Sequence, residues 1–262
     1  MSPIPTTQKA IVAVKYGAPS DVIQYIDDHP VPQPKSNEIL IKVSHSSVNP
    51  VDWKILKGKL SMVIKLKHPY VIGSDVSGEV VGIGSACQRL RIGDSVYTDI
   101  GADTQSAYQQ YVSVPEQQCS IMPNNLSYAD AAGIPLATLT SYQALKRKCN
   151  LQPGQSVLIL GASGGTGTAA VQLAKCFGAS NIVAVCSSKN VEFVKQLGAN
   201  EVIAYDEKKW YEVLQPDTFD CVYDCIGGEG VWDSAQRVLK KNGTFTTIAG
   251  DKQGNPDKGM FG

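Results

Sequence analysis

The sequence has no excess of either charge, and this absence argues against several classes of function. Its 24 basic and 24 acidic side chains give a formal net charge of zero. Proteins that bind nucleic acid or adhere to anionic membranes usually carry a basic excess. No apolar run approaches the roughly 20 residues that are needed to span a bilayer. We therefore expect no nucleic-acid partner and no membrane partner.

Targeting signals and metal-ligand patterns are also missing. The N-terminus has neither the basic and then apolar order of a signal peptide nor the arginines of a transit peptide, since the first arginine is Arg89. We therefore expect a cytoplasmic protein. The three histidines are scattered and the seven cysteines contain no CxxC pair, which argues against a zinc knuckle and a disulfide framework. Cys221 and Cys225 flank an apolar run, which is typical of buried free thiols; a redox role is the alternative.

The two halves of the chain differ in their pattern of strands and helices. Residues 1–125 contain short β-branched runs bounded by Gly, Pro, Asn or Asp, which predicts a compact, barrel-like β domain. Residues 126–262 alternate strands and helices, which predicts an α/β domain with a parallel sheet. An Ala- and Leu-rich stretch over 127–148 predicts one or two helices, with Ser127 as the N-cap of the first.

The second half contains one strand fewer than a complete dinucleotide-binding fold. Such a fold has six strands, whereas the pattern predicts five, followed by a loop that begins near residue 250. The fifth strand would then be an exposed edge. We favour a shortened chain over a divergent form, and expect weak cofactor binding and aggregation. The five strands begin near residues 156, 181, 201, 219 and 243, with a helix over 231–240 before the last.

A glycine-rich turn follows the first of these strands and precedes a helix. Residues 161–167, Gly-Ala-Ser-Gly-Gly-Thr-Gly, fit the G-x-G-x-x-G frame with Ala162 in place of the first glycine. Gly164 would let the backbone approach a pyrophosphate, and Gly167 would let the helix pack closely on the sheet. The amides of the first helical turn would then bind the phosphates. A tight turn without a ligand is the alternative.

The end of the second strand indicates which dinucleotide is bound. An NAD site has Asp or Glu there to bind the ribose hydroxyls, whereas this strand is followed by Ser187, Ser188 and Lys189. Two hydroxyls and an ammonium would bind a 2′-phosphate, which a carboxylate would repel. We therefore predict NADPH as the cofactor. The alternative is that Lys189 is an ordinary exposed lysine.

Six stretches, taken in order, resemble one family. They are SSVNPVDWKILKG, YVIGSDVSGEVVGIGSACQRLRIGDSVY, SAYQQYVSVP, LTSYQAL, GASGGTGTAAVQLAK and CSSKNVEFVKQLGANEVIAY. Together they resemble the zinc-free medium-chain dehydrogenases/reductases, in particular the quinone oxidoreductase branch with zeta-crystallin and the chloroplast-envelope oxoene reductases. The resemblance covers nearly the whole chain. It implies a GroES-like β-barrel domain over 1–125, a Rossmann domain over 126–262 that lacks its last strand, and an active site in the cleft between them.

The resemblance implies chemistry without zinc. Zinc-dependent members have a cysteine and a histidine where this sequence has Asn49, or a neighbour of it, and Ser74. Because Asn and Ser are poor zinc ligands, we expect no metal site. The remaining reaction is hydride delivery from NADPH to a quinone, an enal or an enone, with a hydrogen-bond donor at the carbonyl oxygen.

Three residues are the candidates for the groups around the nicotinamide: Asn49, Asp52 and Lys54. The amide of Asn49 would donate to the substrate carbonyl or to the ribose, and Lys54 would act as a donor or a proton source. The alternatives are a turn at Asn49 before Pro50 and an Asp52–Lys54 ion pair that fixes the loop.

The glycine-rich turn and the resemblance together imply a cofactor site whose residues are spread over the second half of the chain. Its phosphate contacts come from the glycine-rich turn, its 2′-phosphate contacts from the second and third strands, and its remaining contacts from the helix near residue 140 and the last two strands. The residues are Thr140, Ala162, Ser163, Gly164, Gly165, Thr166, Gly167, Ser187, Ser188, Lys189, Tyr205, Ile226, Gly227 and Ala249.

Two further expectations concern assembly and activity. Full-length members are homodimers, and the sixth strand that commonly forms the dimer edge is missing here. The rival hypothesis is a non-enzyme of the same fold, a structural or regulatory NADPH-binding protein with weak or no turnover. NADPH consumption in the presence of an enone or a quinone separates the two hypotheses.

Overall fold

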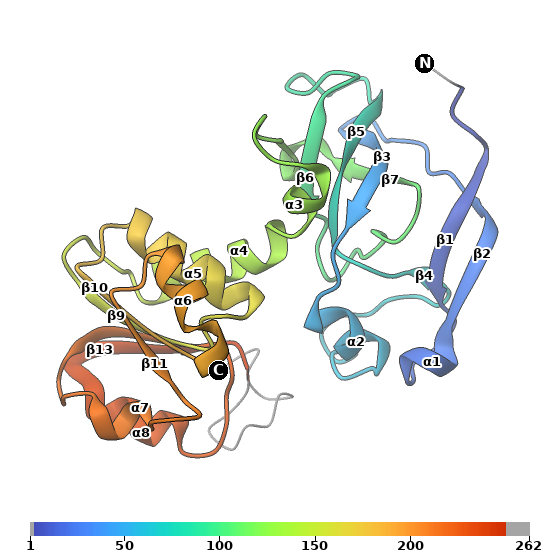
Figure 1. Ribbon diagram of the computed structural model, residues 1–262. Helices are drawn as coiled ribbons and strands as arrows, with labels where there is room; N and C mark the ends of the chain where they lie inside the picture. The colour runs from blue at the N-terminus through green and yellow to red at the C-terminus, as the bar shows by residue number, and fades with distance from the viewer. Residues whose placement is uncertain (1–2, 250–262) are drawn as a thin grey trace. The chain divides into compact units, whose positions relative to one another are not determined.

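The described part of the chain contains three sheets (Figure 1). The computed structural model describes residues 3–249 and divides into two units, residues 1–136 and 137–262. The helix α3 (Tyr128–Ala132) packs on strands of the first unit, so the division follows this helix. The roles of the two halves, one catalytic and one for the cofactor, stay predictions.

The first unit is built on two antiparallel sheets, with strand orders β2-β1-β4 and β7-β3-β5-β6-β8. Alternate side chains of β3 and β5, such as Ile39, Ile41, Val76 and Val80, form one buried core. This unit is the GroES-like domain that the sequence predicts. The strands are β1 (Thr7–Ala13), β2 (Ile23–Pro30), β3 (Glu38–Ser46), β4 (Tyr70–Val71), β5 (Asp75–Ile83), β6 (Ser95–Asp99), β7 (Tyr111–Pro115) and β8 (Ser120–Ile121).

Short helices lie between the strands of this unit. The helix that follows Asn49 was not predicted from the sequence. Helix α2 (Pro50–Leu56) begins where we expected at most a turn, because Asn49 is its N-cap and Pro50 its first residue. Asn before Pro opens a helix as readily as it opens a turn. The predicted cap at Ser127 is confirmed, since its hydroxyl oxygen accepts a hydrogen bond from the Asp130 amide. The other helices are α1 (Pro19–Val22) and η1 (Glu116–Gln118).

The second unit contains the predicted parallel sheet. Its described strands have the order β11-β10-β9-β12-β13, which in chain order is third, second, first, fourth and fifth, as in a Rossmann sheet. The predicted fold class is therefore confirmed for the five described strands. They are β9 (Ser156–Leu160), β10 (Asn181–Cys186), β11 (Glu201–Ala204), β12 (Phe219–Asp224) and β13 (Leu239–Thr247).

Helices cover both faces of this sheet (Figure 1). Val157 and Ile159 of β9 pack with α5 and α6 on one face, and Leu158 and Leu160 pack with α7 and α8 on the other, because successive strand residues point to opposite faces. The helices are α4 (Pro135–Tyr142), η2 (Gln143–Lys148), α5 (Gly165–Cys176), η3 (Ser188–Asn190), α6 (Val191–Leu197), α7 (Trp210–Val213) and α8 (Val231–Val238). No described helix is both long and apolar enough to cross a membrane.

The boundary between α8 and β13 differs from the prediction. The helix that we expected to reach residue 240 ends at Val238, and the strand expected from residue 243 begins at Leu239. Leu239 already pairs with Phe219 of β12, and the register then shifts before Thr244 pairs with Cys221. A pairing partner outside the local sequence therefore ends this helix early.

One prediction about the cysteines is wrong. Cys221 of β12 is not a free thiol but forms a disulfide with Cys149, which ends η2, across 72 residues of sequence. Their Cα atoms lie 5.9 Å apart, within the usual range for a disulfide. Sequence spacing did not reveal the pair, because packing of η2 against β12 brings the two residues together. Cys225 is a free thiol, as predicted.

Candidate functional site

The predicted cofactor residues of the second unit gather at one edge of its sheet. The last paired residues of the strands are Leu160, Cys186, Ala204, Asp224 and Thr247. Because the strands are parallel, their carboxyl ends share one edge, where doubly wound sheets bind ligands. The predicted residues in the glycine-rich turn and after β10, β11, β12 and β13 follow these ends directly.

Two glycines of the turn are required by the protein itself. Gly161 has a φ of +80°, which favours glycine. A Cβ at Gly167 would lie 2.2 Å from the carbonyl oxygen of Gly161 and 2.7 Å from the Cα of Ala162. Only a glycine therefore allows α5 to pack this closely on the strand end, as the sequence predicts for Gly167.

No close contact within the protein requires glycine at the other two positions of the turn, Gly164 and Gly165. Gly164 has an ordinary extended conformation, and a Cβ there would meet only the Gly161 oxygen at 3.5 Å. A Cβ at Gly165 would lie 3.8 Å from the Cβ of Ala137. Both glycines are exposed at the N-terminus of α5, a helix of 12 residues, whose first amides lack intrahelical acceptors. This open, amide-lined turn fits the pyrophosphate of a dinucleotide.

The ends of β9, β12 and β13 contact one another. A Cβ at Gly161 would lie 2.7 Å from Ile226, and one at Gly227 would lie 3.2 Å from Ala249. The buried carboxylate of Asp224 accepts hydrogen bonds from the amides of Ile226 and Gly227, at 3.0 Å each, and from the Thr247 hydroxyl at 2.8 Å. We did not predict this role of Asp224, although a carboxylate that ends an apolar strand was a usable signal.

The predicted 2′-phosphate site contains a carboxylate that the sequence reading missed. Asp206, after β11, accepts hydrogen bonds from the amide of Ser188 at 2.8 Å and from its hydroxyl at 2.7 Å. These bonds, with a smaller contribution from the charge of Lys189, lower the pKa of Asp206. Ser188 is thus already engaged, which leaves Lys189 and the O–H of Ser187 as the groups available to a phosphate. Ser187 is buried, and its hydroxyl oxygen already accepts a hydrogen bond from the Asn190 side-chain amide at 3.1 Å.

The N-terminal part of α5 is also tied to α4. The buried hydroxyl of Ser141 donates to the carbonyl oxygen of Thr166 at 2.7 Å. Thr140, predicted near the nicotinamide, is the preceding residue and is half-exposed. Tyr205 and Ile226 are exposed at 56% each, so both side chains are accessible to a ligand.

In the first unit, Asn49 and Asp52 belong to one buried polar network. Asp52 accepts hydrogen bonds from the Asn49 amide at 2.8 Å and from the Tyr108 hydroxyl at 2.9 Å. The side-chain amide of Asn49 donates to Ser47 at 3.0 Å and to Asp75 at 2.9 Å. Both N–H groups of Asn49 are therefore engaged, and burial raises the pKa of Asp52.

Asp75 is the centre of this network. Its fully buried carboxylate also accepts hydrogen bonds from the Ser47 hydroxyl at 2.6 Å and from the Leu136 amide at 2.9 Å. Burial raises its pKa to about 6, although these hydrogen bonds oppose the shift. We did not predict the role of Asp75 or of Tyr108, since each is distant in sequence from Asn49 and Asp52.

Lys54 and Ser74 differ in their surroundings. Lys54 is half-exposed on α2, and the described residues contain no ion pair between it and Asp52. Ser74 is fully buried and accepts a hydrogen bond from Gln105 at 2.9 Å. In the part of the chain that the structure describes, no group of three or more His, Cys, Asp or Glu could hold a metal ion.

Three buried polar atoms have no hydrogen-bond partner within residues 3–249: Asp52 Oδ1, His68 Nε2 and the Tyr70 hydroxyl. The rings of His68 and Tyr70 lie 5.1 Å apart. Burial, with a smaller contribution from the charges of Tyr16 and Asp52, raises the pKa of Tyr70 to about 12. Asp52 therefore keeps one carboxylate oxygen available for a further hydrogen bond.

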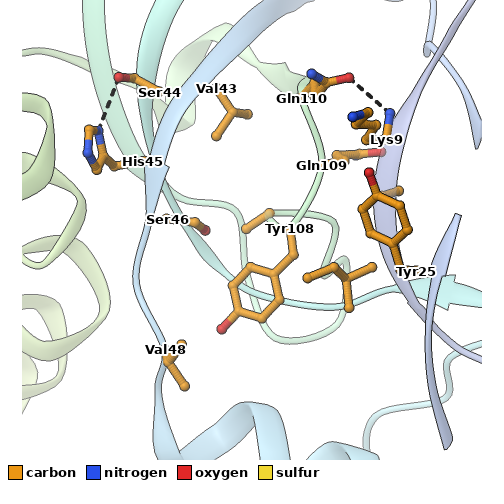
Figure 2. A pocket seen from close by; sticks show the side chains of 13 residues that line it. Lys9, Tyr25, Val43, Ser44, His45, Ser46, Val48, Tyr108, Gln109 and Gln110 are labelled. Atoms are coloured by element: carbon orange, nitrogen blue, oxygen red, sulfur yellow. Dashed lines mark hydrogen bonds between the residues drawn. The ribbon is translucent and has the colours of Figure 1, made fainter. Parts of the chain in front are cut away.

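A cavity of about 470 Å³ lies in the first unit (Figure 2). Its volume is in the range of small-molecule pockets, and the ring of Tyr108, whose hydroxyl binds Asp52, forms part of its wall. The candidates Asn49, Asp52 and Lys54 do not line it, so this cavity is not the predicted catalytic site. Its lining includes Lys9, Ile11, Tyr25, Val43, Ser44, His45, Ser46, Val48, Tyr108, Gln109 and Gln110.

Two family models match the chain, and together they cover parts of both units. The model of the alcohol dehydrogenase GroES-like domain matches residues 35–124, and that of the zinc-binding dehydrogenase matches residues 165–261.

Three curated proteins similar to the chain are named as a reductase, an oxidoreductase or an oxidoreductase homolog. The 2-methylene-furan-3-one reductase of Solanum lycopersicum is 37% identical over 94% of this chain and 63% of that protein. The chloroplastic quinone-oxidoreductase homolog of Spinacia oleracea is 36% identical over 87% of this chain and 70% of its own length. The chloroplastic NADPH-dependent alkenal/one oxidoreductase of Arabidopsis thaliana is 36% identical over 94% and 64%. The chain thus spans less than two thirds of the first and third relatives.

Solved structures show the same fold. The quinone oxidoreductase from Coxiella burnetii matches with a TM-score of 0.79 and 34% identity, over 92% of this chain and 75% of that chain. A putative alcohol dehydrogenase from Sinorhizobium meliloti matches with a TM-score of 0.85 and 27% identity, over 96% and 78%.

Replacing Asp75 with Asn will remove part of the pH dependence of stability. Because the pKa of Asp75 is higher in the folded chain than in the unfolded chain, the folded chain holds an extra proton between about pH 4 and pH 6. Stability therefore declines as the pH rises through this window, by about 2–3 kcal/mol from this group.

Urea unfolding across this pH range measures the effect. The raised pKa values of Asp52 and Asp99 act in the same direction and remain in Asp75→Asn, so the difference between the two proteins isolates Asp75. Equal slopes for both proteins would contradict the assignment.

Two alanine substitutions two residues apart in α5 will affect different properties: Gly167→Ala will lower stability, and Gly165→Ala will lower affinity for a dinucleotide. Gly167→Ala forces a methyl group into backbone atoms and will destabilise the second unit by about 3 kcal/mol. Gly165→Ala fits the protein and improves helix propensity, so its stability will stay within about 1 kcal/mol of the parent. Its affinity for a dinucleotide will fall roughly tenfold or more through a lost phosphate contact.

Thermal unfolding and fluorescence titration with NADPH measure the two effects. A Gly165→Ala variant that binds NADPH like the parent would show that the open turn holds no phosphate.

Proposed function

Because the chain belongs to the medium-chain dehydrogenase/reductase family of oxidoreductases, we propose that it binds NADPH and reduces quinones, enals or enones without zinc. The observation that carries the proposal is the turn at Gly164 and Gly165. These glycines are exposed, and the protein itself gives no steric reason for either. Because packing within the protein does not require these glycines, we infer that they allow a ligand to approach the backbone closely.

The choice of NADPH rests on the groups after β10. Ser187 and Lys189 would bind the 2′-phosphate, and the carboxylate of Asp206 opposes this binding. Two bonds from Ser188 and the neighbouring charge of Lys189 offset part of the charge of Asp206. The Arabidopsis thaliana relative is named an NADPH-dependent alkenal/one oxidoreductase, which supports the same cofactor.

The zinc-free part of the proposal rests on the residues at the expected ligand positions. Ser74 is engaged with Gln105, and Asn49 with Ser47 and Asp75. These are neutral oxygen and nitrogen groups that zinc sites seldom use. A carbonyl-polarising donor must then come from a side chain.

Bound NADPH would supply the hydride, and the residues of the first unit would manage the charge on the substrate. Asn49 has both side-chain N–H groups engaged, so we assign it a positioning role in place of the donor role expected from the sequence. The Asp52 carboxylate accepts hydrogen bonds from the Asn49 amide and the Tyr108 hydroxyl and so holds the start of α2. Lys54, half-exposed on the same helix, is then the donor to the developing oxyanion or the proton source.

Replacing Lys189 with Glu will weaken NADPH binding roughly tenfold or more, because a charge-assisted contact to the 2′-phosphate is lost, and will leave NADH binding nearly unchanged. Lys241→Glu, at an exposed lysine of β13, makes the same charge change and is the control. Asp206→Asn will shift the preference further toward NADPH. Fluorescence titration of each variant with both cofactors measures this preference. If Lys189→Glu and Lys241→Glu behave alike, Lys189 does not contact the 2′-phosphate.

A panel of enals, enones and quinones, assayed with NADPH and with NADH, tests the reaction. We expect acceptor-dependent oxidation of NADPH, and a lower kcat with unchanged NADPH affinity in Lys54→Met. Tight NADPH binding without turnover on any acceptor would refute the reductase and leave an NADPH-binding protein.

A further inference from the structure

The segment over residues 53–67 combines positive charge with exposed apolar side chains. Between Asp52 and Asp75, which are both buried, the sequence has five lysines and no carboxylate. Lys57, Lys59, Lys65 and Lys67 are exposed. The chain as a whole has zero net charge, but residues 53–67 carry a local excess of positive charge. We call these residues the lysine-rich segment.

Apolar side chains lie among these lysines. Met62 is 92% exposed and Val63 60%, and the Trp53 ring is 36% exposed. The ammonium groups of Lys57 and Lys59 lie 5.2 Å and 5.6 Å from the centre of that ring. Exposed Met, Val and Trp with lysines around them are typical of a surface that enters the headgroup layer of a membrane.

The backbone holds this surface in shape. The amides of Val63 and Ile64 donate to the carbonyl oxygen of Leu60, at 2.9 Å and 2.7 Å, and close a turn. Leu60 is buried beneath the turn, whereas Met62 and Val63 are exposed at its tip. The segment thus presents its apolar tip without a folding step on binding, which lowers the entropic cost of association.

Helix α1 packs on α2 and carries one acidic residue, Asp21, whose carboxylate accepts a hydrogen bond from Ser20 at 2.8 Å. The four exposed lysines of the segment therefore outnumber the acidic residues of this adjoining helix.

We propose that the lysine-rich segment docks the chain on anionic lipid bilayers. The lysines match the negative headgroups, and the tip at Met62 and Val63 would enter the acyl boundary. A nucleic acid is the weaker fit, because a phosphate backbone offers these two side chains nothing apolar to contact. Binding of this kind is reversible and sensitive to salt. If the proposed function holds, the segment would bring the enzyme to quinones and enals that partition into lipid.

Vesicle co-sedimentation tests the docking without cofactor or substrate, so its result does not depend on the proposed function. We expect binding to vesicles of phosphatidylcholine with phosphatidylserine, little binding to phosphatidylcholine alone, and release by salt. The Trp53 fluorescence will shift to the blue on binding, and Trp53→Phe will lose this shift.

Variants locate the surface. Lys65→Gln with Lys67→Gln will weaken binding roughly 30-fold, and Met62→Ser with Val63→Ser roughly tenfold. The matched controls, Lys208→Gln with Lys241→Gln and Ile121→Ser with Val213→Ser, change exposed lysines and exposed apolar side chains elsewhere and will bind like the parent. Circular dichroism will show whether each double variant is folded. If a double variant is not folded, its two single substitutions are tested instead.

Three results would overturn the proposal. The first is no binding to anionic vesicles, and the second is equal binding by the parent and both segment variants. The third is binding to heparin as tight as to vesicles, with Met62→Ser and Val63→Ser without effect, which would indicate a general polyanion surface.

Discussion

The close approach of α5 to the end of β9 is the constraint on which the second unit depends. A side chain at Gly167 would collide with backbone atoms of Gly161 and Ala162, so the helix begins directly at the sheet edge. Its first turn then lies beside Gly164 and Gly165, where the chain leaves room. The packing requirement of one glycine thus positions the open turn that we propose as the phosphate site.

A comparable constraint organises the first unit around a buried charge. Asp75 gathers the hydroxyl of Ser47, the amide of Asn49 and the backbone of Leu136, and burial raises its pKa. These bonds hold the start of α2, and with it Asp52 and Lys54. Because both side-chain N–H groups of Asn49 are engaged in this network, we propose Lys54 rather than Asn49 as the group that acts on the substrate.

The sequence predicted those features whose position follows from a general rule of the fold. Parallel strands end at one edge, so the residues after each strand could be placed together, and the glycine frame located the turn that precedes α5. Contacts across long stretches of sequence left no such signal. Asp206 reaches Ser188 from 18 residues away, Tyr108 reaches Asp52 from 56, and Cys149 reaches Cys221 from 72.

We propose that a dinucleotide binds at the carboxyl edge of the sheet, with its pyrophosphate at the open turn of Gly164 and Gly165. A crystal structure of the chain soaked with NADP⁺ tests this most directly. We expect density for the pyrophosphate over this turn and for the 2′-phosphate beside Lys189. A cofactor bound elsewhere, or an adenosine end turned away from Lys189, would contradict it.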